Sequence, residues 1–191
     1  MDIKLKHVSK QFGQKIVLKD LNAIFLEGRV NCLMGASGIG KTTAVNIIMG
    51  LMEPDSGEVL GRQGKQITAV FQEDRLIEHW NAVKNVKLVC DKGVSEDIIK
   101  QELTILGIKD SFDKPVINFS GGMRRRVAIV RAMLAKSDLI ILDEPFRGLD
   151  EALKMQVIEY IKQRTEGKTV IIVTHDKEDA VQLNANLVML G

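Results

Sequence analysis

The stretch that decides the fold is Gly35-Ala36-Ser37-Gly38-Ile39-Gly40-Lys41-Thr42, which matches the phosphate-loop pattern G-x-x-x-x-G-K-[S/T] in full. It follows the apolar run 31–34 and precedes a helical pattern that begins at Thr43, which is the context that the pattern requires. Glycines let backbone N–H groups curl around an anion, and a helix N-terminus adds positive potential. We therefore expect residues 35–43 to bind a nucleotide, with Lys41 reaching the β- and γ-phosphates and Thr42 ligating Mg²⁺.

An acidic pair follows the apolar run 139–142, where Asp143 and Glu144 end a predicted strand. The carboxyl end of a parallel strand lies beside the phosphate loop in this class of fold. Asp143 is then placed to hold Mg²⁺, and Glu144 is placed to orient and polarise the attacking water. The two motifs together indicate a nucleoside triphosphatase. The sequence has no Asn-Lys-x-Asp motif for guanine, which disfavours a GTPase, whereas a small-molecule kinase, a helicase and a transporter motor remain open.

Short apolar runs recur along the chain and are mostly unbroken, as in strands that are buried on both faces of a parallel sheet. They are residues 31–34, 67–71, 139–142, 170–173 and 187–190. Helical patterns lie between several of these runs, and apolar residues at Leu149, Leu153, Val157 and Ile161 form one helical stripe. This alternation of strand and helix predicts an α/β fold.

The stretch from about residue 73 to 133 differs from the rest of the chain, because it contains no convincing strand pattern. Ser95 is suited to cap a helix whose first turn carries Glu96 and Asp97. We interpret this stretch as a helical subdomain inserted into the α/β core of a single domain that covers residues 1–191.

The bulk composition is that of one soluble domain. The chain has 191 residues, of which 45% are hydrophobic, and a net charge of +2. The length and the hydrophobic content are sufficient for one sizeable core. The small net charge gives no strong electrostatic attraction to nucleic acid or to a membrane surface. No apolar run approaches the roughly 20 residues that span a bilayer, so any membrane role has to come through a partner. Cys32 and Cys90 form no disulfide or metal-binding pattern, which fits a reducing compartment such as the cytoplasm.

The motif that separates the remaining classes of NTPase is Asn118-Phe119-Ser120-Gly121-Gly122-Met123-Arg124. Ser120 can cap a helix that starts with Gly121 and Gly122, whose exposed backbone N–H groups form a second anion-binding end. The motif resembles the signature of the ABC ATPase superfamily, Leu-Ser-Gly-Gly-Gln, with Phe119 and Met123 departing from the commonest form. The residues of the motif are similar to those of importer ATPases of the nitrate, sulfonate and taurine group. The resemblance implies that Ser120, Gly121 and Gly122 close on the γ-phosphate of ATP held by a second subunit, in a homodimer or with a paired ABC subunit.

The resemblance covers nearly the whole chain and implies roles for further residues. Phe12 would stack on the adenine of ATP, and Gln72 would touch Mg²⁺ and the attacking water. Asp150 would couple the two sites across the dimer, and His175 would contact the γ-phosphate and act with Glu144 and Gln72 in catalysis. Each residue also has an ordinary structural interpretation: Phe12 as an apolar anchor, Gln72 and His175 as surface residues, and Asp150 as a helix cap.

The resemblance also implies the architecture and the partners. The expected fold is a P-loop core, a mostly parallel sheet with flanking helices, joined by an antiparallel β lobe and the inserted helical subdomain. The expected function is that of the ATP-hydrolysing subunit of an ABC importer, on the cytoplasmic face of the cell membrane. Its partners would be a transmembrane permease and an extracytoplasmic substrate-binding protein. The segment Glu73–Leu76 with Trp80 resembles the permease contact, although Trp80 could equally be a core residue. The end of the chain at Gly191 predicts no C-terminal regulatory domain.

Two alternatives remain open. The first is a non-transport ABC ATPase that acts on nucleic acid or ribosomes; Arg124-Arg125-Arg126 is the strongest basic cluster that could support it. We interpret this cluster instead as the solvated face of a helix whose other face is apolar, and we expect no nucleic acid partner. The second is a nucleotide-binding interaction module with little hydrolysis, which the presence of Glu144 and His175 disfavours.

Overall fold

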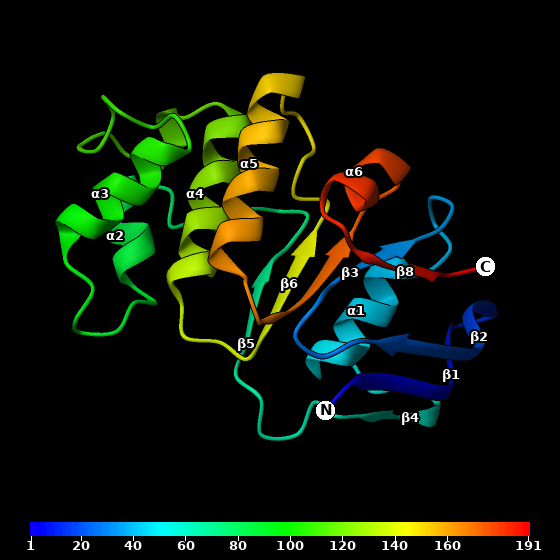
Figure 1. The fold of residues 1–191 in the computed structure, drawn as a ribbon. Helices are drawn as coiled ribbons and strands as arrows, with labels where there is room; N and C mark the ends of the chain where they lie inside the picture. Colours follow the sequence, from blue (N-terminus) through cyan, green and yellow to red (C-terminus); the bar gives the residue numbers. More distant parts are fainter.

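The computed structural model describes residues 1–191 as two sheets with helices between and around them (Figure 1). The larger sheet has five parallel strands in the order β5-β6-β7-β3-β8. Their bounds are β3 Val30–Met34, β5 Ile67–Val70, β6 Leu139–Asp143, β7 Thr169–Val173 and β8 Asn186–Met189. The apolar runs in the sequence therefore form one sheet, which confirms the predicted α/β class.

The central strands of this sheet are buried on both faces, which is why their sequences are unbroken apolar runs. Every residue of β6 and β7 is buried. Successive side chains alternate between two hydrophobic clusters: Ile140 and Leu142 face one side of the sheet, whereas Leu139 and Ile141 face the other. The sheet is therefore the layer on which both cores of the protein are built.

Helices cover both faces of the parallel sheet (Figure 1). On one face lie α4 (Gly121–Leu134) and α5 (Glu151–Arg164), and the predicted stripe of α5 buries Val157 and Ile161 there. On the other face lies α1 (Lys41–Met49), and α6 (Lys177–Gln182) connects β7 to β8. No helix of this chain combines the length and the apolar character that a membrane span requires.

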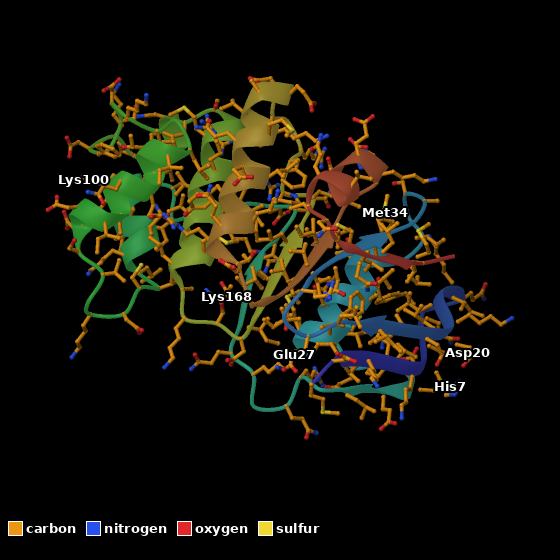
Figure 2. The ribbon with its side chains drawn as sticks, in the orientation of Figure 1. His7, Asp20, Glu27, Met34, Lys100 and Lys168 are labelled. Atoms are coloured by element: carbon orange, nitrogen blue, oxygen red, sulfur yellow. The ribbon has the colours of Figure 1, made fainter.

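The smaller, antiparallel sheet packs on the far side of α1, so that this helix lies between two sheets (Figure 1). Its strands have the order β2-β1-β4, with bounds β1 Ile3–Phe12, β2 Lys15–Phe25 and β4 Ser56–Leu60. Near its outer end, His7 Nδ1 lies 2.7 Å from Asp20 Oδ1, and the two side chains lie close together in Figure 2. Both residues have positive φ angles, 52° and 51°, where the register of β1 and β2 shifts. This sheet is the predicted antiparallel β lobe.

The chain between β5 and α4 contains helices and no strand, as the sequence predicts, although loops make up most of its length. It contains α2 (Ala82–Lys87), α3 (Glu96–Ile105) and the 3-10 turn η1 (Val116–Asn118), which lie beyond α4 at one side of the molecule (Figure 1). Ser95 Oγ accepts a hydrogen bond from the Ile98 N–H at 3.3 Å, which confirms the predicted cap of α3.

A buried polar network fastens α3 to α5. Glu102 is 7% exposed and accepts hydrogen bonds at 2.8 Å from the Tyr160 hydroxyl and from Arg164 Nε. A second bond of 2.5 Å, from Arg164 Nη2 to the other carboxylate oxygen, makes the arginine contact bidentate. Burial raises the pKa of the Tyr160 hydroxyl, so this group remains a proton donor at neutral pH.

The contribution of this network can be measured with Tyr160→Phe, which removes one buried hydrogen bond to a charged acceptor. We expect the free energy of unfolding to fall by about 1.5 kcal/mol in urea denaturation. The control is Gln163→Ala on the same helix, which removes an exposed bond to Glu159 and should cost less than about 0.5 kcal/mol. Equal stability of the two variants would mean that the Tyr160 hydroxyl adds nothing to the bonds that Arg164 makes with Glu102.

Candidate active site

The phosphate loop connects β3 to α1 and has a shape that only glycine permits at two positions. Gly38 and Gly40 have φ angles of 78° and 110°. A Cβ atom at Gly40 would lie 2.7 Å from Leu18 Cδ2 on β2, so the antiparallel sheet sets the curvature of the loop. Lys41 is only 8% exposed, and its Nζ donates to the carbonyl oxygens of Gly35 at 2.8 Å and Ala36 at 2.9 Å. Its ammonium group is thereby held over the loop.

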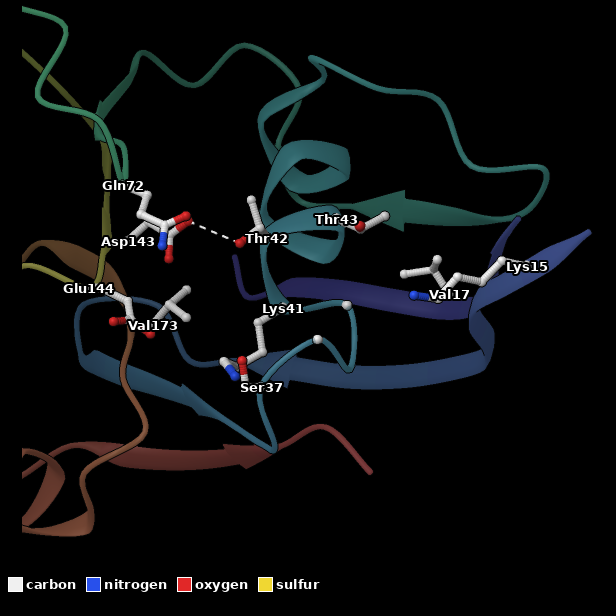
Figure 3. Close-up of a pocket in the computed structure, with 12 residues that line it drawn as sticks. Lys15, Val17, Ser37, Lys41, Thr42, Thr43, Gln72, Asp143, Glu144 and Val173 are labelled. Carbon is white, nitrogen blue, oxygen red and sulfur yellow. Dashed lines mark hydrogen bonds between the residues drawn. The ribbon is translucent and has the colours of Figure 1, made fainter. Parts of the chain in front are cut away.

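Thr42 and Asp143 meet across the edge of the parallel sheet, as Figure 3 shows. Thr42 Oγ1 donates a hydrogen bond of 3.2 Å to Asp143 Oδ2. Asp143 is the last residue of β6 and is 5% exposed. Burial raises the pKa of its carboxyl group, and the hydrogen bond from Thr42 opposes that rise. A hydroxyl and a carboxyl group therefore share one small polar corner.

Glu144 occupies a sharp turn directly after β6. Its φ angle is 50°, an uncommon value for a residue with a side chain, and its N–H donates to the Val173 carbonyl at 3.0 Å. Its Oε1 lies 3.6 Å from His175 Nδ1, and the His175 side chain is 74% exposed. The turn and the bond to the end of β7 bring Glu144 and His175 together at the same edge of the sheet.

Most of these groups surround one cavity of about 310 Å³ (Figure 3), whereas His175 lines a separate cavity of about 320 Å³ that shares Glu144 with the first. The first cavity is lined by Lys15, Val17, Ser37, Gly38, Gly40, Lys41, Thr42, Thr43, Gln72, Asp143, Glu144 and Val173. Most of the predicted phosphate loop, the acidic pair and Gln72 are thus brought together, whereas Gly35, Ala36 and Ile39 of the loop do not line the cavity. Lys15 and Val17 were not foreseen, because no motif marks them. Phe12 does not line the cavity; its ring is 47% exposed, and it pairs across the strands with Lys15, which does.

A second hollow of about 600 Å³ adjoins the first and shares Gln72 with it. Ser120 Oγ accepts from the Met123 N–H at 3.2 Å, which confirms it as the cap of α4. Gly121, Gly122 and Asp150 also line this hollow. A Cβ atom at Gly122 would lie 3.3 Å from Leu149 Cδ2, so the start of α4 packs closely on the loop before α5. Asp150 caps α5 through a bond of 2.9 Å from the Leu153 N–H.

The arginine cluster of α4 corrects one prediction from the sequence. Only Arg124 is partly solvated, whereas Arg125 and Arg126 are 6% and 7% exposed. Arg126 Nη1 donates to the Leu106 carbonyl at 2.5 Å, and Arg125 donates to the carbonyl of Phe71, also at 2.5 Å. The prediction of a solvated face is therefore wrong for Arg125 and Arg126. Their guanidinium groups are buried and donate hydrogen bonds to backbone carbonyl groups of preceding segments. Buried arginines also provide no surface for nucleic acid.

Lys154 of α5 anchors the segment that carries His175. Its Nζ lies 2.8 Å from Asp176 Oδ2 and 2.6 Å from Asp179 Oδ1, and the residue is 9% exposed. Thr174 Oγ1 donates to the other oxygen of Asp179 at 2.6 Å. The hydrogen bond to Asp176, together with the ion pair to Asp179, raises the pKa of Lys154, and the same bond lowers the pKa of Asp176. No sequence motif pointed to Lys154.

The fold and the site together define a nucleotide-binding protein of the phosphate-loop class. The sequence pattern of the ABC transporter family matches residues 18–147. The chain therefore belongs to the ABC transporter family, as the signature around Ser120 predicts.

Individual relatives agree with this assignment. The spermidine/putrescine import ATP-binding protein PotA of Spiroplasma citri is 36% identical over 99% of this chain and 59% of the relative. The bicarbonate transport ATP-binding protein CmpD of Synechococcus elongatus is 33% identical over 97% of this chain and 74% of the relative. The chain thus spans less than two thirds of the length of the PotA relatives that it matches.

Solved structures show the same fold. A dimeric ATP-binding cassette in a post-hydrolysis state, bound to ADP and Pi, is 29% identical. It superposes with a TM-score of 0.84 over 98% of this chain and 94% of that structure. The predicted P-loop core with flanking helices and an antiparallel lobe is therefore a fold that an ATP-binding cassette adopts.

The anchor at Lys154 can be tested with Lys154→Met, which leaves the buried Asp179 without its cation. We expect the free energy of unfolding to fall by about 3 kcal/mol at pH 7. The control is Lys162→Met on the same helix, where an exposed pair with Glu159 is lost at a cost below about 1 kcal/mol.

The loss at Lys154 should depend on pH in a defined direction. The raised pKa of Lys154 adds stability that is lost as the pH rises through that value, and the lowered pKa of Asp176 adds stability that is lost as the pH falls through it. The difference between wild type and Lys154→Met should therefore be largest at neutral pH in urea titrations. A difference that stays constant into strong acid would contradict this assignment.

Proposed function

We propose that this chain is the ATP-binding and ATP-hydrolysing subunit of an ABC importer, and that closure of an ATP-loaded dimer drives a separate permease. The observation that carries the proposal is the position of Gln72, which lines both the phosphate-loop cavity and the hollow at the start of α4. A site suited to hydrolysis thus adjoins a second anion-binding surface. The relative PotA is named as an import protein and CmpD as a transport protein, and these names support a role in transport and its inward direction.

The nucleotide-binding role rests on residues 35–43 and on Phe12. The N–H groups of the loop and the start of α1 would cradle the phosphates, while Lys41 would release its loop carbonyls to reach the β- and γ-phosphates. The half-exposed ring of Phe12 stands beside Lys15 at the margin of the cavity, where it can stack on the adenine.

The donor set at the sheet edge fits Mg²⁺. The chain has no cluster of three or more histidine, cysteine or carboxylate side chains that could hold a metal ion. A site of one hydroxyl, one carboxylate and one amide, completed by phosphate oxygens and water, suits Mg²⁺ better than an all-protein cage. Thr42 Oγ1, Asp143 and Gln72 would hold it, and when bound it would neutralise charge on the β- and γ-phosphates.

Hydrolysis would be promoted from the turn after β6. The fixed backbone of Glu144 aims its carboxylate into the cavity, where it can accept a proton from the attacking water. His175, 3.6 Å from Glu144, would contact the γ-phosphate and support the position of the water, and Gln72 would help to orient the water. The three side chains would thus act on one water molecule.

Dimerisation would complete the site. The N–H groups of Gly121 and Gly122 at the start of α4, capped by Ser120, would close on the γ-phosphate held by the second subunit. Asp150 at the start of α5 would couple the two sites across the interface. ATP would then hold the dimer together, and phosphate release would let it open. The dimeric state of the similar cassette bound to ADP and Pi supports this arrangement.

The permease contact is expected around Trp80. Asn85 is fully buried, and its side chain binds the N–H of Ile77 at 2.7 Å and the carbonyl of Ile77 at 3.0 Å, which fixes the segment before α2. Trp80 and Ile77 are each 38% exposed on this fixed segment, as suits an anchor for a protein partner. We place the subunit on the cytoplasmic face of the membrane, with a substrate-binding protein on the far side.

The choice of transported substrate lies outside this chain in the proposal. Relatives of similar identity, 36% and 33%, are named for polyamine import and for bicarbonate transport. The permease and the binding protein would therefore select the substrate, while the cassette supplies the ATP cycle.

The hydrolytic role is tested with Glu144→Gln. We expect the turnover number for ATP to fall by at least about 100-fold, because the general base is lost, while ATP binding persists. Size-exclusion chromatography with MgATP should then show a trapped dimer. Glu159→Gln, an exposed carboxylate on α5, should retain turnover and show no trapped dimer. A monomeric Glu144→Gln protein with normal turnover would refute the scheme.

The transport role is tested by using the full chain as bait on detergent-solubilised native membranes. We expect a multi-spanning membrane protein to be recovered, lost with Trp80→Ala and retained with Ile98→Ala, which removes an equally exposed apolar side chain on α3. Recovery of nucleic acid or ribosomes alone would overturn the transport assignment but leave the ATPase core intact.

A further inference from the structure

The loop from Phe71 to Arg75 is held by arginine side chains instead of a backbone ladder. The sequence predicts that the strand continues to Phe71, but β5 ends at Val70. Four carbonyl groups of the loop, those of Phe71, Gln72, Asp74 and Arg75, accept hydrogen bonds from guanidinium groups of α4. Two of these bonds come from Arg125 and two from Arg131. The position of Gln72 is therefore set by α4.

Arg125 makes the central contact of this set. One nitrogen donates to the Phe71 carbonyl at 2.5 Å and a second donates to the Gln72 carbonyl. Its Nε lies 3.2 Å from Asp74 Oδ1, an ion pair without the alignment of a hydrogen bond. Arg125 is 6% exposed, so water does not compete for the hydrogen bonds of its guanidinium group. A planar guanidinium can hold three groups in this way, whereas a point-like ammonium cannot.

The held loop has a strained backbone. Arg75 has a φ angle of 46°, and its guanidinium lies 3.6 Å from the centre of the Phe71 ring. Its carbonyl accepts from Arg131 Nη1 at 2.9 Å. A strained residue persists where surrounding contacts over-determine it, and here those contacts come from α4.

Arg125 also belongs to the start of α4, because it lies little more than one turn after Ser120. Ser120, Gln72 and Arg125 line the same hollow. The guanidinium therefore joins the capped helix end, which faces the second subunit in the proposed dimer, to the residue that reaches the phosphate-loop cavity.

We propose that Arg125 is a positioning residue for hydrolysis: it fixes the Gln72 loop to the first turns of α4, so that Gln72 and the Ser120 helix end move as one body. This inference rests on the proposed roles of Gln72 and Ser120. Closure of the helix end on a partner's nucleotide then places Gln72 against the attacking water in the same movement. Without the two bonds from Arg125, the loop retains the bonds from Arg131 to Asp74 and Arg75 and a looser ion pair of 4.0 Å between Arg124 and Asp74.

The test compares the full-length variants Arg125→Gln and Arg125→Lys with Arg29→Gln, a matched loss of charge at an exposed arginine between β2 and β3, away from the loop of Gln72. We expect Arg125→Gln to lower kcat for ATP about tenfold or more, to change KM for ATP less than twofold and to raise the Mg²⁺ concentration at half-maximal rate. Arg125→Lys should recover only part of kcat, and Arg29→Gln should keep it. A variant that melts at lower temperature but keeps kcat per folded molecule would show a structural role only and overturn the inference.

A double-mutant cycle separates this inference from the proposed function. If Arg125 acts through Gln72, then Gln72→Ala with Arg125→Gln will be no slower than Gln72→Ala alone. Independent, multiplicative losses would overturn the inference. Normal kcat in Gln72→Ala would overturn the proposed role of Gln72 and the inference with it, whereas a slow Gln72→Ala beside a normal Arg125→Gln would remove the inference alone. If Arg125→Gln does not fold, the cycle is run with Arg125→Lys and has the same outcomes.

Discussion

The parallel hydrogen-bonded ladder of β6, β7 and β3 is the constraint on which the rest of the structure depends, because it brings three strand ends to one edge. β3 leads into the phosphate loop, β6 ends at Asp143, and β7 is followed by His175. The bond from Thr42 to Asp143 joins residues 101 positions apart and exists because the register places those strand ends together. The sheet can carry polar groups at its edge because both of its faces are sealed by apolar packing.

Two turns that follow strands of this sheet hold a residue in an uncommon backbone conformation. Glu144 and Arg75 both have positive φ angles, a conformation that costs of order 1 kcal/mol or more for a residue with a side chain. Each turn is held by a partner from another element: Glu144 by the carbonyl of Val173, and Arg75 by the guanidinium of Arg131. The side chains near the cavity are thereby aimed by packing and hydrogen bonds, and the chain does not depend on local propensity there.

Buried charge connects the separate parts of the molecule. Glu102 joins α3 to α5, Lys154 joins α5 to the segment of His175, and Arg125 joins α4 to the loop of Gln72. Such contacts are directional, and a buried charge without its partner is costly, so neighbouring elements are held in one relative position. In the dimer cycle that we propose, segments that are joined by such buried charges would move as units.

The class of the protein and most of the candidate site could be predicted from the sequence alone, because the residues of the phosphate loop, the acidic pair and the Ser120 motif are contiguous. A contiguous motif carries its own backbone geometry, and unbroken apolar runs are enough to indicate a doubly covered parallel sheet. The sequence could not predict that Arg125 is buried, that Lys15 lines the cavity or that Lys154 holds the segment of His175. These features depend on contacts between elements that are far apart in the sequence. Arg125, for example, donates a hydrogen bond to the carbonyl of Phe71, which lies 54 positions away. A local sequence pattern predicts the helix or strand to which a residue belongs. The partner of a buried charge depends instead on how the helices and strands pack against one another.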